Sequence, residues 1–302
     1  SMLITGSGEK ESLPGADENL FRDEGIILYL EDVRGRLTIT MEEYLCGYLP
    51  LVIPVDYEPE CLKAQAVLLR TEVIGELRRQ VKQGSREVIL RKDSYLTYDQ
   101  MEEMWGSGYS EYQEKVRQAV SSTQGIYLTS EGLPIEACFF HVSAGTTRSA
   151  GEFLGQEYTY LSGVECPKDY LSPDYLSYAE YDKEKLEKLL GGSIIKLIRD
   201  EAGYVEWVDI ASYETGENAS FTGEWLRKKL GLSSPCFKIE EEGKKVIFQV
   251  KGVGHGFGMS QFSANEVALE GADYQTILSY FFQNITFDKY EQGVGVTLSK
   301  FD

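Results

Sequence analysis

Hydrophobic residues recur at spacings of three and four positions between residues 59 and 73, which predicts a helix. Pro59 suits the first turn of that helix. Weaker helical patterns cover residues 41–45, 99–105, 112–120, 183–190, 261–269 and 273–282. Apolar and β-branched runs between turn residues predict strands at 25–30, 37–40, 125–129, 134–141, 205–211, 246–250, 285–287 and 294–298.

These elements do not alternate regularly along the chain, which favours an α+β fold over a doubly wound parallel sheet. Residues 1–24 are polar and aperiodic and are typical of a flexible leader. Residues 142–178 are rich in Ser, Gly, Tyr and Pro, as loops are. No internal repeat is evident in the sequence.

The composition narrows the class of protein. Of the 302 residues, 42% are hydrophobic, enough for a globular core. The net charge of −19 and the lack of a basic run argue against nucleic acid and anionic membrane surfaces as partners. No apolar run reaches the length of a transmembrane helix. The 20 tyrosines fit strand interiors or a half-wet surface such as a sugar-binding groove.

The cysteines and histidines provide few candidates for a catalytic or metal-binding site. The five cysteines are widely spaced and odd in number, which predicts unpaired thiols. A metal site would have to combine Cys138, His141, Cys166 and His255, and their spacing matches no standard zinc pattern. Motifs of serine hydrolases, phosphate-binding loops and dinucleotide-binding folds are absent.

Glycine occupies every second position from Gly252 to Gly258. If the preceding strand continues, the four missing side chains lie on one face, which leaves room for a ligand or another backbone. His255 would then lie on the opposite face, and Ser260 would cap the next helix. A ligand-binding role and a simple packing role are equally open at this point.

Several blocks of sequence, taken together and in order, resemble the stage II sporulation protein D (SpoIID/LytB) family. The blocks are E-Y-L-C-G at 43–47, P-E-C-L-K-A-Q-A at 59–66 with R-T at 70–71, W-G at 105–106, F-F-H-V-S-A-G-T-T at 139–147, Y-L-S-G-V-E-C-P-K-D at 160–169, G-V-G-H-G-F-G-M-S-Q-F-S-A-N at 252–265 and G-A-D-Y-Q-T-I-L at 271–278. An ordered set of this kind is far more specific than a single motif. The resemblance extends over residues 25–302, with an N-terminal block at about 30–140 and a C-terminal portion at 141–302.

The resemblance implies an α+β fold of the SpoIID type with a glycan-binding groove, and lytic transglycosylation of peptidoglycan glycan strands during sporulation. That reaction needs a single carboxylic acid, because the nucleophile comes from the substrate. The family's acid is the Glu of an E-M-P triplet, and Val52-Ile53-Pro54 stands at that place here. Val52 cannot carry a proton.

Three hypotheses follow. The first is a family member that binds glycan strands with impaired catalysis. The second is an active transglycosylase that uses a displaced carboxylate, with Asp56, Glu58 and Glu60 nearest in sequence. The third is a metal-dependent wall hydrolase using Cys138 and His141.

The resemblance also implies a set of substrate-binding candidates, namely Gln65, Arg70, Ser143, Thr147, His255, Ser260 and Gln261. We expect the helix 59–73, the loop 143–148 and the segment 252–259 to form one groove, with no cofactor. The expected partners are glycan strands and other cell-wall or sporulation proteins, and no nucleic acid. The expected location is extracytoplasmic, with a membrane anchor outside this chain.

Overall fold

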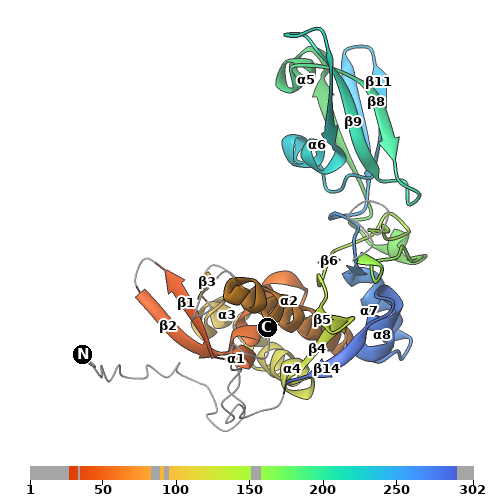
Figure 1. Ribbon diagram of the computed structural model, residues 1–302. Coiled ribbons are helices and arrows are strands. Elements are labelled where there is room, and N and C mark those ends of the chain that lie inside the picture. Colours follow the sequence, from red (N-terminus) through yellow and green to blue (C-terminus); the bar gives the residue numbers. More distant parts are fainter. Residues whose placement is uncertain (1–26, 33–34, 83–88, 92–94, 151–157, 291–302) are drawn as a thin grey trace. The chain divides into compact units, whose positions relative to one another are not determined.

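The computed structural model describes residues 27–32, 35–82, 89–91, 95–150 and 158–290. The predicted leader at 1–24 and the predicted strand at 294–298 lie outside these residues. Helices and several separate sheets are mixed along the chain, which confirms the α+β class (Figure 1). The described residues form two compact units, the first from those within 27–56 and 77–125 together with Tyr290, and the second from those within 57–76 and 126–289.

The first unit pairs a small sheet with helices. Its strands are β1 (Ile27–Asp32), β2 (Gly35–Thr40) and β3 (Ile89–Arg91), with β1 in the middle. Its helices are α1 (Met41–Val52), α3 (Tyr98–Trp105) and α4 (Tyr109–Ser122), with a 3₁₀ turn, η2 (Gly106–Gly108), before α4.

Helix α1 begins directly after β2 because its first turn is capped on both sides. The Thr40 hydroxyl accepts from the Glu43 N–H, and the Glu43 carboxylate accepts from the Thr40 N–H. This reciprocal pair satisfies donors that a helix start leaves open. Gly47 lets the Tyr95 ring pack against the helix, since a Cβ there would lie 2.2 Å from Tyr95 Cε2. Val52 is the last residue of α1 and is half-buried.

The second unit contains the long helix α2 (Pro59–Lys82) as far as residue 76. It confirms the helix predicted from the periodicity at 59–73. Around it lie β4 (Ile126–Ser130), β5 (Leu133–Pro134) and β14 (Thr286–Lys289) in one sheet, and α7 (Gln261–Leu269) and α8 (Tyr274–Phe281). The strand predicted at 134–141 is interrupted: only β5 and the short β6 (Phe139–Phe140) are extended, and β6 pairs with β13 (Met259–Ser260).

Residues 176–251, which we call the repeat module, use one order of elements twice. The first half is β7 (Leu176–Asp182), α5 (Lys183–Leu190), β8 (Gly192–Arg199) and β9 (Val205–Ser212). The second half is β10 (Asn218–Thr222), α6 (Gly223–Leu230), β11 (Phe237–Glu242) and β12 (Lys245–Lys251). This repetition of structure was not visible as a repeat of sequence.

Both helices of the module begin and end in the same way. Asp182 and Thr222 cap their N-termini with side-chain oxygens. Gly191 and Gly231 end them at φ of 71° and 65°, in the left-handed region where glycine has no steric penalty. Local chemistry thus sets the length of each helix at eight residues.

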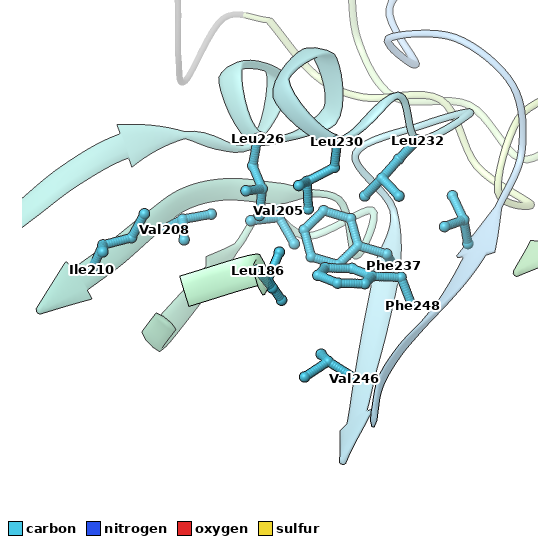
Figure 2. Packing of buried hydrophobic residues seen from close by; sticks show 11 residues of the cluster. Leu186, Val205, Val208, Ile210, Leu226, Leu230, Leu232, Phe237, Val246 and Phe248 are labelled. Carbon is cyan, nitrogen blue, oxygen red and sulfur yellow. The ribbon is translucent and has the colours of Figure 1, made fainter. Parts of the chain in front are cut away.

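The first strand of each half pairs with the hairpin of the other half. The resulting sheets have the orders β11-β12-β7 and β10-β9-β8. A single core joins the halves, with Leu186 and Val208 from the first half packed in one cluster with Leu226, Phe237 and Phe248 from the second (Figure 2). Among the described helices, none has the length and apolar character needed to cross a bilayer.

Candidate functional site

The glycine segment, residues 252–258, is not the continuous strand that the sequence predicted. Strand β12 ends at Lys251, and β13 begins only at Met259. The four glycines have φ between 76° and 113°, a left-handed region that other residues enter at a cost. Two hydrogen bonds, between the backbones of Val142 and Val253, hold the segment against the chain that follows β6.

Each glycine gives room to a neighbouring part of the protein. A Cβ at Gly252 would lie 2.7 Å from the Val142 carbonyl oxygen, and one at Gly258 would lie 2.1 Å from that of Cys138. A Cβ at Gly256 would lie 2.7 Å from the Tyr204 ring. Of the two roles left open by the sequence, close packing within the protein, against backbone at Gly252 and Gly258 and against a side chain at Gly256, is the one that these contacts support.

Asp169 is a buried carboxylate of the second unit that accepts hydrogen bonds from two other segments. It lies in the 3₁₀ turn η4 (Asp169–Leu171). Its Oδ2 accepts from the Ser143 N–H and from the Ser260 hydroxyl, both at 2.7 Å, and its Oδ1 accepts from the Ser263 hydroxyl at 2.5 Å. The carboxylate therefore joins the loop after β6 to the start of α7. The sequence placed Asp169 at the end of a family block but gave no reason to single it out.

Two of the predicted substrate-binding residues, Ser143 and Ser260, meet at this carboxylate. Ser260 also caps α7, as predicted, because its hydroxyl accepts from the Ser263 N–H. The Ser143 hydroxyl accepts from the Gly145 N–H. Both serines are fully shielded from solvent.

A pair of buried amides joins α2 to α7. Gln261 Nε2 donates to Gln65 Oε1 at 3.0 Å, and Gln65 Nε2 has no hydrogen-bond partner among the described residues. The Cys61 thiol donates to the Gln261 carbonyl at 3.8 Å. Burial, and after it the charge of Glu58, raises the pKa of this thiol above its ordinary value, so it remains protonated.

Arg70 and Thr147 also contact backbone and are buried. Arg70 Nη1 donates to the Ile126 carbonyl at 2.9 Å and so fastens α2 to β4. The Thr147 hydroxyl accepts from the Val164 N–H at 2.9 Å. The structure thus brings Gln65, Ser143, Ser260 and Gln261 to the start of α7, whereas Arg70 lies at β4 and Thr147 at the 164 loop.

His255 is half-buried beside a buried cation. Its Nδ1 accepts from the Phe257 N–H at 3.1 Å. The Arg148 guanidinium lies 4.4 Å from the centre of the Phe257 ring and donates through Nε to Asp200 Oδ2 at 2.5 Å. Burial lowers the pKa of His255, and the charges of Arg227 and Arg148 act in the same direction against that of Glu224. The ring is therefore neutral at neutral pH.

Glu58 and Glu60, the carboxylates suggested above as a displaced catalytic acid, lie at the start of α2. Both carboxylate oxygens of Glu60 have hydrogen-bond partners. Its Oε1 pairs with Lys63 Nζ at 2.6 Å, and its Oε2 accepts from the Tyr274 N–H, at the start of α8, at 2.9 Å. Glu58 is half-buried, and its backbone N–H donates to Asn265 Oδ1 at 2.7 Å.

The metal hypothesis finds no ligand set in the described part of the chain, where no three His, Cys, Asp or Glu residues group around a possible ion. His141 Nε2 instead lies 3.0 Å from Asp174 Oδ2. Burial, followed by nearby acidic side chains, raises the pKa of Cys138 and of Cys166 to about 11. None of the five cysteines forms a disulfide, as predicted.

Comparisons with known proteins agree with the resemblance. The family model described as "Stage II sporulation protein" matches residues 31–130. The stage II sporulation protein D of Bacillus amyloliquefaciens is 30% identical over 275 residues, 87% of this chain and 78% of that protein. That of Bacillus subtilis (strain 168) is 32% identical over 256 residues, 81% of this chain and 73% of that protein. The amidase enhancer of Bacillus subtilis is 24% identical over 301 residues, 82% of this chain but only 40% of that protein.

Proposed function

Because this chain belongs to the stage II sporulation protein D family, we propose that it binds peptidoglycan glycan strands during sporulation but cleaves them poorly or not at all. Its location is then extracytoplasmic. It acts at the wall through binding, together with other cell-wall or sporulation proteins, and needs no cofactor.

Val52 carries this proposal. It ends α1, at the position that corresponds to the family's acid, and an isopropyl group can neither protonate the glycosidic oxygen nor accept a proton from the attacking hydroxyl. General acid–base catalysis contributes about 10²–10⁴-fold to a reaction of this kind. A scaffold without the acid retains its binding surface and loses most of its rate.

The buried polar network supports retention of that binding surface. Asp169 with its three donors, and the Gln65–Gln261 pair, fix loops whose shape a bare apolar core would not specify. We assign the buried candidates a positioning role, which covers Gln65, Arg70, Ser143, Thr147, Ser260 and Gln261. His255, which is half-buried, is left as the candidate for direct contact with the glycan.

An active enzyme with a displaced carboxylate is the second candidate. Glu58 suits that role better than Glu60, because both oxygens of Glu60 already accept hydrogen bonds from Lys63 and Tyr274. The name of one relative, the amidase enhancer, describes an effect on another protein. A role through a partner protein would suit a family member that does not cleave.

The test is incubation with purified glycan strands stripped of stem peptides, followed by mass spectrometry for 1,6-anhydro-muramyl ends and by co-sedimentation. We expect the wild type to bind and to release no anhydro product. Val52→Glu restores a carboxyl at a half-buried position, where desolvation raises its pKa toward the range of an acid catalyst, and partial cleavage is expected.

Val52→Gln is the matched control, since it has the shape of Glu without the acidic proton and is expected to remain inactive. Robust cleavage by the wild type that is abolished by Glu58→Gln or Glu60→Gln would instead establish the displaced carboxylate.

A further inference from the structure

A cavity of about 270 Å³ lies in the second unit between α7, α8 and residues 165–168. Its walls are predominantly apolar, formed by side chains such as Val267, Ile277 and Phe281. A shallower hollow, lined in part by Ser279 and Phe287, shares Thr276 and Tyr280 with it. The two together form one surface across α8, which we call the α8 groove.

Acidic side chains surround the α8 groove. Glu165, Glu266 and Glu270 line the cavity, and Asp273 lines the hollow. Hydrogen bonds from Thr276 lower the pKa of Asp273, so it is ionised at neutral pH. Lys168 is the one basic residue among the lining residues, and it is already paired with Glu270 and lies 3.9 Å from Glu266. The groove therefore has negative charge in excess.

Tyr280 gives the groove a fixed aromatic wall. Its side chain is 44% exposed, yet its hydroxyl donates to the Glu165 carbonyl at 2.6 Å. A hydrogen-bonded aromatic ring loses little conformational freedom when a ligand packs against it. Anchored aromatic residues beside an apolar pocket are frequent at the energetic centres of protein interfaces.

We propose that the α8 groove binds a segment of a partner protein that inserts one bulky apolar side chain, flanked by Lys or Arg. A sugar ring would lose hydration of its hydroxyls against Val267, Ile277 and Phe281 without gaining partners there. A Leu, Met or Phe side chain has no such loss, and its basic neighbours complement Glu266 and Glu270 at the rim. The negative charge of the α8 groove and the apolar walls of its cavity thus favour a peptide that has both basic and bulky apolar side chains.

The probes are three fluorescently labelled peptides, KKFKK, KKSKK and EEFEE, titrated with the full chain in anisotropy measurements. We expect KKFKK to bind at least about tenfold more tightly than either of the others, since each of those lacks one of the two complementary features. Thr276→Trp places a large ring between cavity and hollow and is expected to weaken KKFKK by about tenfold or more.

Glu266→Gln with Glu270→Gln keeps the apolar walls and removes two rim charges. This double variant is expected to weaken KKFKK and to reduce the dependence of its binding on salt. Glu201→Gln, in an exposed turn of the repeat module, is the matched control and leaves the affinity unchanged. Co-sedimentation with glycan strands is expected to be unaltered in all three variants.

The proposal is wrong if KKFKK binds no better than KKSKK or EEFEE, or if the double variant binds it as the wild type does. Preferential binding of a chitin oligosaccharide that Thr276→Trp abolishes would assign the groove to sugar and overturn it. So would a concentration-dependent dimer that Thr276→Trp dissociates, since the occupant would then be a second copy of the chain.

Discussion

The glycines of the 252–258 segment differ in kind from left-handed glycines in the open turns of the described chain. At Gly216, in the turn between β9 and β10, φ is 70° and no atom lies within 4 Å of the position of a Cβ. At Gly258 φ is 78°, and the Cys138 carbonyl lies 2.1 Å from that position. One glycine is needed for its backbone angle alone, the other for the angle and the space.

Alanine at these two glycines separates the two requirements. Gly216→Ala should cost about 1–2 kcal/mol of unfolding free energy, the strain of a left-handed residue. Gly258→Ala should cost more than about 4 kcal/mol, because backbone must also move. Urea unfolding followed by circular dichroism measures both. Equal costs would mean that the glycine segment yields easily to the added carbon and is not packed as described.

His255 makes stability depend on pH. Its pKa in the folded protein lies below its ordinary value of 6.5, so the unfolded chain binds the proton more readily. The contribution of the neutral His255 ring to the unfolding free energy is complete above about pH 6.5. It is lost as the pH falls toward the pKa of His255 in the folded protein. His255→Asn keeps an acceptor for the Phe257 N–H without titrating.

We expect the unfolding free energy of the wild type to fall more between about pH 7.5 and pH 5 than that of His255→Asn. Comparing the two proteins cancels the titration of the carboxylates that they share. An equal fall in both would show that His255 titrates alike in the folded and unfolded chains.

At the scale of elements, Asp169 is the point where a loop, a 3₁₀ turn and a helix start depend on one side chain. In Asp169→Asn, an amide N–H₂ would face the buried hydrogen-bond donors that the carboxylate now accepts from. The substitution should therefore lower the unfolding free energy by about 2–4 kcal/mol. Asp174→Asn is the control, since Asp174 is 58% exposed and pairs only across the surface with His141. It should cost less than about 1 kcal/mol. Similar costs in urea unfolding would contradict the central role of Asp169.

Local sequence was sufficient for elements with internal signals. The helix at 59–73 has a long apolar period, and the predicted helices at 183–190 and 261–269 coincide with α5 and α7. The strands β3, β7, β8, β10, β11 and β13 were missed. Of these, β10 is a short polar run, Asn218–Thr222, whose partner β9 belongs to the other half of the module. Its pairing is set by tertiary structure, which leaves no periodic trace.

The sequence predicted which residues lie at the candidate site better than it predicted what each of them does there. Family blocks pointed to Gln65, Ser143 and Ser260, and the structure brings these to the start of α7. Their burial was not predictable, because polar side chains are expected at the surface unless a partner is known. Asp169, the partner of Ser143 and Ser260, lies 26 and 91 residues away from them, and Gln261, the partner of Gln65, lies 196 residues away.

At the scale of the whole molecule, charge should govern how the protein meets its proposed substrate. The chain carries a net charge of −19, and stripped glycan strands carry a carboxylate on each muramyl residue. Salt shortens the screening length from about 30 Å at 0.01 M to about 8 Å at 0.15 M. Binding to these strands is therefore expected to strengthen with salt over that range.

Co-sedimentation at several NaCl concentrations checks this, with chitin, which lacks the carboxylates, as the control that should respond little. A bound fraction that falls steadily with salt would mean that a local basic surface, and not the net charge, controls the encounter.

The exchange of strands in the repeat module has a mechanical consequence. The chain enters the module at Leu176 and leaves it at Lys251, and these residues lie opposite each other in the antiparallel β7–β12 pair. Tension applied to the flanking chain would act on this pair at one end. The hydrogen bonds between the strands would then break one after another, beginning with the bond from the Gly252 N–H to the Tyr175 carbonyl. Because β7 belongs to one half and completes the sheet of the other, peeling it away removes a strand from both halves at once. Tension on the flanking chain would thus open the module from this end, whereas separating its two halves would require breaking their shared core.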